Sequence, residues 1–133
     1  MVDNKKIRIT EADFLTGIFA VLTLRGHKTI PLNEFFEKAM AKIFQEFTEH
    51  AKQNDFEMRF RIRPHPLHGD SGTIHNGVLG AMQRRIISLD SPANDVIRIK
   101  LTKDLAKVIL DDMTSGKLFI DFSDRIIEIF RIN

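Results

Sequence analysis

The change of hydrophobic period between residues 71 and 113 is the feature that most constrains how this chain folds. From residue 71 to about residue 86, apolar side chains recur at helical spacing. The segments IISL and VIRIKL then favour two strands, and DSPAND between them is typical of a turn. Thr102 is a suitable N-cap for a helix over KDLAKVILDDM, with Gly116 as its stop. The stretch therefore predicts a helix, a β-hairpin and a second helix. The apolar face of the first of these helices is expected to consist of Ile74, Val78, Leu79, Met82 and Ile86.

Two more helices are expected upstream. Thr10 suits the N-cap of the first, and Gly26 suits its stop. Apolar residues dominate between them, so this helix is expected at the centre of the core. Pro31 suits the first turn of the second helix, whose apolar stripe runs over about four turns towards Gln53. The chain is thus rich in helix before the predicted hairpin.

Extended segments are expected at three further places. KKIRI is typical of a short strand. Residues 56–63 alternate, with an apolar face starting at Phe56 and a charged face that holds three arginines, until Pro64 ends the pattern. KLFIDF and RIIEIFRIN favour a C-terminal β-hairpin, with a final helix as the alternative. No internal repeat or linker divides the sequence, so residues 1–133 are expected to form one domain.

Composition narrows the classes of protein. The chain has 133 residues, 43% hydrophobic and 29% charged, as a globular domain does. It has no cysteine, which excludes disulfides, thiolate nucleophiles and cysteine-ligated zinc. No segment reaches the roughly 18 consecutive apolar residues of a membrane span. A cytoplasmic protein without a membrane partner is therefore expected. Net charge is only +2, but residues 56–110 carry nine basic and five acidic side chains, a distribution that suits a polyanionic partner.

The order helix, helix, helix, hairpin, helix resembles that of winged-helix domains. The resemblance covers roughly residues 10–113 and rests mainly on SGTIHNGVLGAMQRRIISLDSPANDVIRIKLTKD. It implies an α+β domain with a winged-helix-like core, a β-hairpin wing, an inserted strand and a C-terminal extension over residues 114–133. In that family the third helix typically enters the major groove of DNA and the hairpin touches phosphate. The residues that would face DNA by position are Thr73, Asn76, Gln83 and Arg84.

Two other features fit a nucleic-acid interface. Gly77 and Gly80 fall on the expected outward face of the third helix, where the absence of a side chain lets another surface approach. That surface is either a ligand, another helix of this chain or a second copy. The charged face of the alternating segment could contact phosphate, or it could be the solvated side of an edge strand. Its basic residues are Arg59, Arg61 and Arg63.

The functions expected from the resemblance are forms of macromolecular recognition without catalysis or cofactor. The first is a small DNA-binding transcriptional regulator. The second is a protein-binding adaptor or an antitoxin-like protein on the same scaffold. The apolar C-terminal segment, which includes Phe119 and Phe130, is expected either to close the core or to pair two subunits in a homodimer.

Three histidines and an aspartate raise the alternative of a metal site. Imidazole and carboxylate are ligands of zinc and other divalent ions, although the spacing matches no established motif. The other expectation for His75 is a partly buried side chain with a backbone partner. The four residues are His65, His68, Asp70 and His75.

An enzyme is the remaining alternative. GTIHNGVLGAM resembles the segment that opens the central helix of hotdog-fold thioesterases, with His75 at the position of the motif histidine. The resemblance implies a helix N-terminus directed at a thioester carbonyl. It covers only residues 72–82, and Gln83 and Arg84 stand where that family generally carries a carboxylate. A hydrolase that uses Ser71 lacks the nucleophile-elbow sequence.

Overall fold

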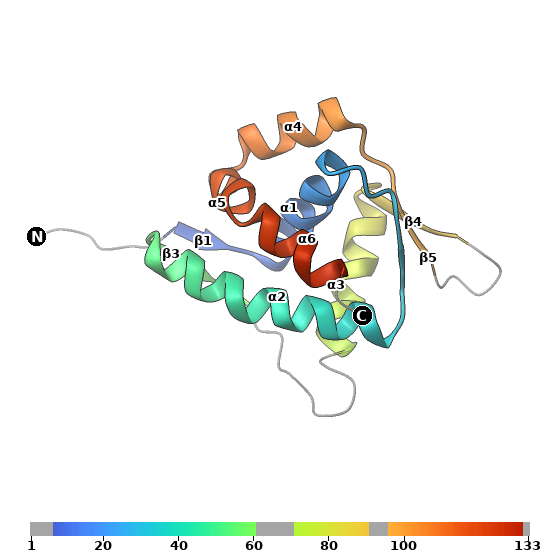
Figure 1. Ribbon diagram of the computed structural model, residues 1–133, viewed down its shortest axis with the longest axis horizontal. Helices are drawn as coiled ribbons and strands as arrows, with labels where there is room; N and C mark the ends of the chain where they lie inside the picture. Colours follow the sequence, from blue (N-terminus) through green and yellow to red (C-terminus); the bar gives the residue numbers. More distant parts are fainter. Residues whose placement is uncertain (1–6, 61–70, 91–95, 132–133) are drawn as a thin grey trace, which may run out of the picture.

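The fold is α+β, as the sequence predicts, and helices make up most of it (Figure 1). A computed structural model describes residues 7–60, 71–90 and 96–131. The elements, in chain order, are β1 (Ile7–Ile9), α1 (Glu11–Leu24), β2 (Thr29–Pro31), α2 (Glu34–Gln53), β3 (Phe56–Met58), α3 (Ser71–Gln83), β4 (Ile87–Asp90), β5 (Val96–Ile99), α4 (Lys103–Asp112), α5 (Gly116–Asp121) and α6 (Ser123–Arg131).

The strands form two small sheets at opposite ends of the molecule (Figure 1). β1 pairs in parallel with β3. At the other end, β5 lies between β2 and β4 in an antiparallel sheet. Ile97 of β5 is opposite both Ile30 and Leu89, so one face of this sheet presents aliphatic side chains to the core. The hairpin predicted from IISL and VIRIKL is confirmed. The strand β2 was not predicted.

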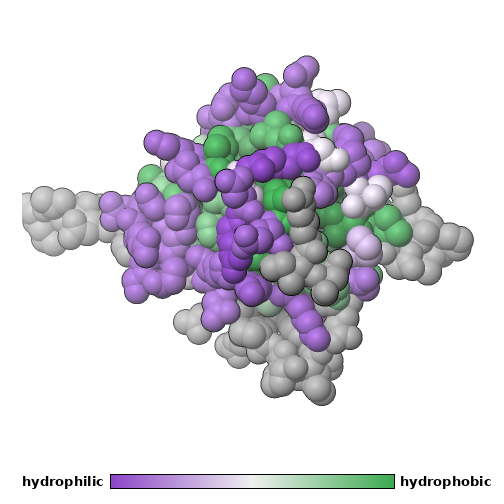
Figure 2. Space-filling model, in the orientation of Figure 1, coloured by the Kyte–Doolittle hydropathy of each residue, from purple (hydrophilic) through white to green (hydrophobic). Residues whose placement is uncertain are grey.

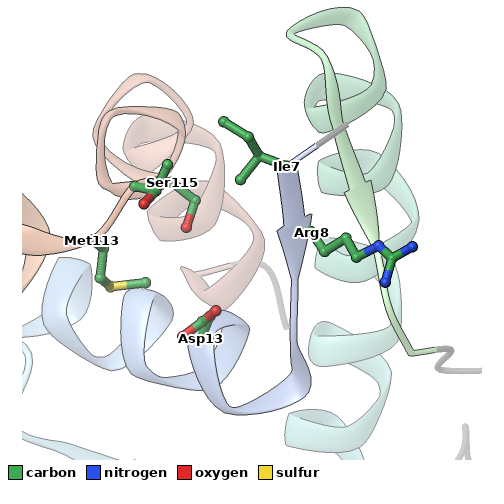
Figure 3. A pocket seen from close by; sticks show the side chains of 6 residues that line it. Ile7, Arg8, Asp13, Met113 and Ser115 are labelled. Carbon is green, nitrogen blue, oxygen red and sulfur yellow. The ribbon is translucent and has the colours of Figure 1, made fainter. Parts of the chain in front are cut away.

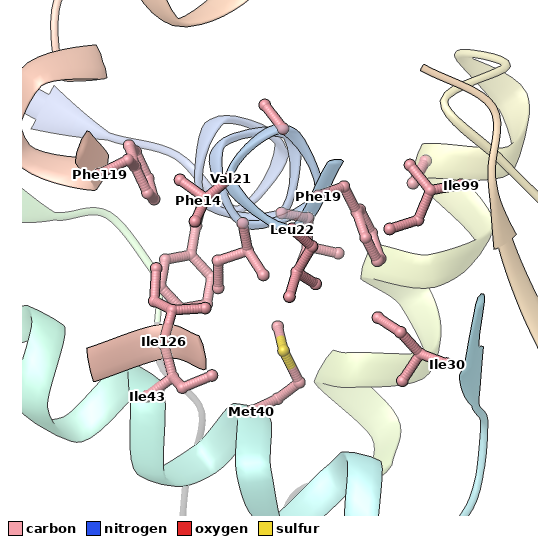
Figure 4. Packing of buried hydrophobic residues seen from close by; sticks show 14 of the residues in the cluster. Phe14, Phe19, Val21, Leu22, Ile30, Met40, Ile43, Ile99, Phe119 and Ile126 are labelled. Atoms are coloured by element: carbon pink, nitrogen blue, oxygen red, sulfur yellow. The ribbon is translucent and has the colours of Figure 1, made fainter. Parts of the chain in front are cut away.

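Helix α1 is the centre of the core, as its composition predicts. Almost all its residues from Phe14 to Thr23 are buried (Figure 4). Helices α3, α4, α5 and α6 contact α1, and α2 contacts α3 and α6 (Figure 1). Thr10 caps it, because the Thr10 Oγ1 accepts a hydrogen bond from the Asp13 N–H at 3.1 Å. Gly26 follows its end with φ +87°, a conformation that favours glycine. Both predicted boundaries are confirmed.

Two other predicted boundaries differ from the structure. Pro31 does not open α2; it ends β2, and Asn33 caps α2 by accepting a hydrogen bond from the Phe36 N–H at 3.1 Å. Gly116 does not end α4, which stops at Asp112; it begins α5. The predicted Thr102 cap is confirmed, since its hydroxyl accepts from the Leu105 N–H at 3.1 Å.

The C-terminal segment is helical, so the expected hairpin is wrong and the alternative helix is right. KLFID lies in α5, Phe122 is the C-cap of that helix, and RIIEIFR lies in α6. Phe119, Ile126 and Ile129 are buried within the chain. The segment therefore closes the core of its own chain, and Figure 4 shows Phe119 and Ile126 among the side chains that pack between α1 and α2.

On the face drawn in Figure 2, the described residues are largely hydrophilic, with apolar side chains visible between them. Among the described residues, no helix combines the length and the apolar character that crossing a bilayer requires.

Ion pairs fasten α6 to its neighbours. The Arg125 guanidinium donates to both carboxylate oxygens of Glu46 on α2, at 2.6 and 2.8 Å, and also bonds Glu128. At the start of α6, Arg25 bonds Ser123 and Asp124. A two-bond arginine–carboxylate contact fixes orientation as well as distance, so Glu46 holds α6 in register along α2.

Acid is expected to remove the stabilisation that Glu46 provides. The hydrogen bond from Arg125 holds the pKa of Glu46 below its usual value, against a smaller opposing effect of burial. A carboxylate whose pKa is lowered on folding stabilises the protein above its unfolded pKa and loses that effect as the pH falls through the folded value. Glu46→Gln should therefore lower the urea midpoint at pH 7, and the difference from the native chain should vanish at low pH. Glu49→Gln, an exposed change on the same helix, is the matched control. A pH-independent difference for Glu46→Gln would contradict the argument.

Candidate functional site

Helix α3 has three flanks with different environments. Ile74, Val78 and Ala81 are buried and face the core. A second flank, which contains Gly77 and Gly80, lies towards α1. The third flank is exposed, and we call it the outer face of α3. Its members, spaced so that they share one side of the helix, are His75, Asn76, Leu79 and Gln83.

The glycine flank does not face outward, and that prediction is wrong. Gly77 is buried, and a Cβ built on it would lie 2.4 Å from the Leu15 Cδ1 of α1. Gly77 lets two helices of the same chain approach closely, which is one of the alternatives left open by the sequence. Gly80 lies nearer the margin, where its missing Cβ would meet only the Arg84 Nη1 at 3.2 Å.

Arg84 is exposed but lies over α1. Its Nη2 is 3.3 Å from the Thr16 Oγ1 and 3.4 Å from the Ala12 carbonyl oxygen, both weak donor contacts. The predicted grouping of Arg84 with Asn76 and Gln83 is therefore only partly realised. Asn76 and Gln83 share the outer face, and Arg84 stands at its edge.

The outer face of α3 combines amide side chains with one large apolar side chain. Asn76 and Gln83 are exposed, as predicted. Leu79 was expected in the core but is 40% exposed between them. His75 was expected to be partly buried, yet it is also exposed. The sequence of α3 contains no acidic residue, and Arg84 and Arg85 follow it directly; the Glu11 carboxylate of α1 lies on the glycine flank, beside Gly77.

The alternating segment that begins with β3 lies away from the β4–β5 hairpin. Arg59 is exposed just after β3, and its N–H donates to the Ile9 carbonyl at 2.8 Å, extending the pairing with β1. Phe56 and Met58 are partly buried and Glu57 is exposed, which confirms the alternation there. Arg59 therefore lies next to the two-stranded sheet, which is separate from the sheet that contains β4 and β5 (Figure 1).

Several predicted site residues lie outside what the structure describes. Arg61 and Arg63 belong to a range that it does not describe, as do His65, His68 and Asp70. The backbone of Thr73 is helical, but its side chain is also outside the described set. Within the described ranges, no three histidine, aspartate or glutamate side chains come together as a metal site would require.

Comparison with known proteins gives no relative. No protein-family model, curated protein or solved structure matches this chain.

Proposed function

We propose that this chain is a small DNA-binding regulator with a winged-helix-type core, which reads duplex DNA with the outer face of α3. The order of α1, α2 and α3, followed by the β4–β5 hairpin and α4, supports the core. Pairing of β2 with β5 ties the hairpin to the helices. The observation that carries the proposal is the outer face itself, which offers two amides and no carboxylate.

The chemistry of this face suits a major groove. Asn and Gln side chains can form two hydrogen bonds with the edge of an adenine. Asn76 and Gln83 are seven positions apart, about 10 Å along a helix axis, which spans roughly three base-pair steps. Arg84 and Arg85 follow at the C-terminal end of the helix, where they can contact phosphate and set the position of α3 on the duplex. Leu79 between the amides offers an apolar contact to a thymine methyl.

DNA binding is expected to weaken with salt and to depend on the two amides. Duplexes that bind the chain are first selected from a random pool, and their affinity is measured by fluorescence anisotropy. We expect this affinity to fall steeply between 50 and 200 mM salt. Asn76→Ala or Gln83→Ala should cost about tenfold on the best duplex and relax the preference at one position. Arg85→Ala should weaken all duplexes alike and lower the salt slope by about one. Gln45→Ala, an exposed amide on α2, is the matched control. Equal binding by the two α3 amide variants and the native chain would refute this interface.

The exposed Leu79 supports a second candidate, a protein-binding use of the same face. An apolar side chain amid polar ones is a suitable anchor for a protein partner. Affinity for a protein partner that does not change with salt concentration, and that Leu79→Ser abolishes, would favour this function. Salt-dependent DNA binding that Asn76→Ala and Gln83→Ala weaken would favour the first.

A further inference from the structure

A hollow at the opposite side of α1 from the hairpin has the features of a second binding site. It has a volume of about 180 Å³ and opens to solvent between β1, the first turn of α1 and the α4–α5 connection (Figure 3). The residues that line it are Ile7, Arg8, Asp13, Met113, Thr114 and Ser115.

Two of the side chains that line the hollow, Ser115 and Asp13, carry oxygen acceptors. Ser115 as a whole is 5% exposed, its hydroxyl makes no capping hydrogen bond with α5, and the residue lines the hollow. The carboxylate of Asp13 forms no ion pair or hydrogen bond with a described residue. Ser115 and Asp13 lie on facing sides of the hollow (Figure 3). Both groups border the open hollow, so their oxygens are available to accept hydrogen bonds from a donor that occupies the space between them.

The main chain of β1 adds a third acceptor. The Ile7 N–H donates to Asp55, and the Ile9 carbonyl accepts from Arg59, so these two residues face β3. Backbone groups alternate sides along a strand, and the carbonyl and N–H of Arg8 therefore point to the free edge, where the hollow lies. The Arg8 side chain extends the other way, with its Nε 3.4 Å from Glu57 (Figure 3). Its positive charge is thus directed away from the hollow.

We propose that this hollow binds a primary ammonium group on a short apolar stem, as found in a lysine side chain or an alkylamine. An ammonium group has three donors and no acceptor. The Asp13 carboxylate, the Ser115 hydroxyl and the Arg8 carbonyl provide three acceptors, and the carboxylate makes the contact charge-assisted. The walls fit the stem, because Ile7 is 47% exposed at the rim and Met113 is an adaptable apolar neighbour. An anion would be repelled by Asp13.

The site can be tested on the full chain by NMR titration with n-butylammonium chloride. Saturable amide shifts are expected at Arg8, Thr114 and Ser115, with no comparable change on the outer face of α3. Two control probes separate the contributions: n-butanol has the stem without the charge, and tetramethylammonium chloride has the charge without N–H donors. Neither should reproduce the shifts. Equal shifts with either control would overturn the proposal.

Variants test the named acceptors. Asp13→Asn should weaken butylammonium binding at least tenfold and Ser115→Ala several-fold, whereas Asp121→Asn, an exposed change on α5, should leave it unaltered. Unchanged binding in both site variants would overturn the assignment, and circular dichroism checks that each variant folds. If Asp13→Asn fails to fold, Ser115→Ala and the probe comparison still decide.

The source of the ammonium group follows from a second titration with Nα-acetyl-lysine methylamide. Tighter binding than butylammonium indicates a lysine of a partner protein, and weaker binding indicates a free amine. This site does not rest on DNA binding, so Asp13→Asn should leave the salt-dependent affinity for DNA unchanged.

Discussion

Replacing Phe119 by alanine is expected to lower the free energy of unfolding by about 4 kcal/mol, within the range seen when a buried phenylalanine is truncated. The Phe119 ring is fully buried. It stacks on Phe47 with centroids 4.6 Å apart, lies 6.4 Å from Phe14, and covers Gly17, where a Cβ would come within 2.6 Å of the ring. No neighbour can fill the space, because the ring occupies the junction of α1, α2 and α5. Urea denaturation followed by circular dichroism measures the change.

Ile120→Ala is the matched control for this prediction. Ile120 is the next residue of α5 but is 46% exposed, so its truncation should cost less than about 1 kcal/mol. Equal losses for the two variants would mean that α5 does not seal the core through Phe119.

The C-terminal helices show where local pattern fails to decide secondary structure. KLFIDF and RIIEIFRIN are rich in phenylalanine and isoleucine, which favour strands in the absence of tertiary packing. Packing overrides that preference here. Phe119 and Phe122, three residues apart, both meet the rings of α2, and Ile126 reaches the space between α1 and α2. A strand would place successive side chains on opposite faces and could not bury this set on one side.

Two of three helix starts fixed by a capping side chain were predicted, the Asn33 cap of α2 was missed, and the short strand fixed by pairing was not predicted. Thr10 and Thr102 accept hydrogen bonds from the residues three positions on, so their sequence context alone identifies the helix starts. Strand β2 has only three residues and ends in proline, without an alternating pattern. It exists because Ile30 pairs with Ile97, which is 67 positions away in the sequence.

The candidate site was predictable in part for a similar reason. Helical spacing identifies residues that share a face, and it placed Asn76 and Gln83 on the exposed side. Spacing does not identify which face another helix covers. Gly77 lies against Leu15 of α1, while Leu79 is left in solvent, so the true outer face is rotated relative to the predicted one. That rotation depends on contacts between α1 and α3, which no local pattern encodes.

Gly116→Ala is expected to lower the free energy of unfolding by about 3 kcal/mol, because the added methyl has no room. A Cβ on Gly116 would lie 1.7 Å from the Leu110 carbonyl oxygen and 2.7 Å from its carbonyl carbon. These are backbone atoms at the end of α4, so the overlap is relieved only by moving α4 against α5. Such a movement would also displace Phe119 from the rings of α2.

Gly80→Ala is the informative control, because the same substitution should have the opposite effect. A Cβ on Gly80 would meet only the end of the Arg84 side chain, at 3.2 Å, and that end can move into solvent. Alanine is favoured over glycine within a helix by about 1 kcal/mol, so Gly80→Ala should stabilise the protein. Urea denaturation of both variants measures the contrast. Stabilisation of both variants by a similar amount would show that glycine's backbone freedom, and not the close approach of α4 to Gly116, governs both positions.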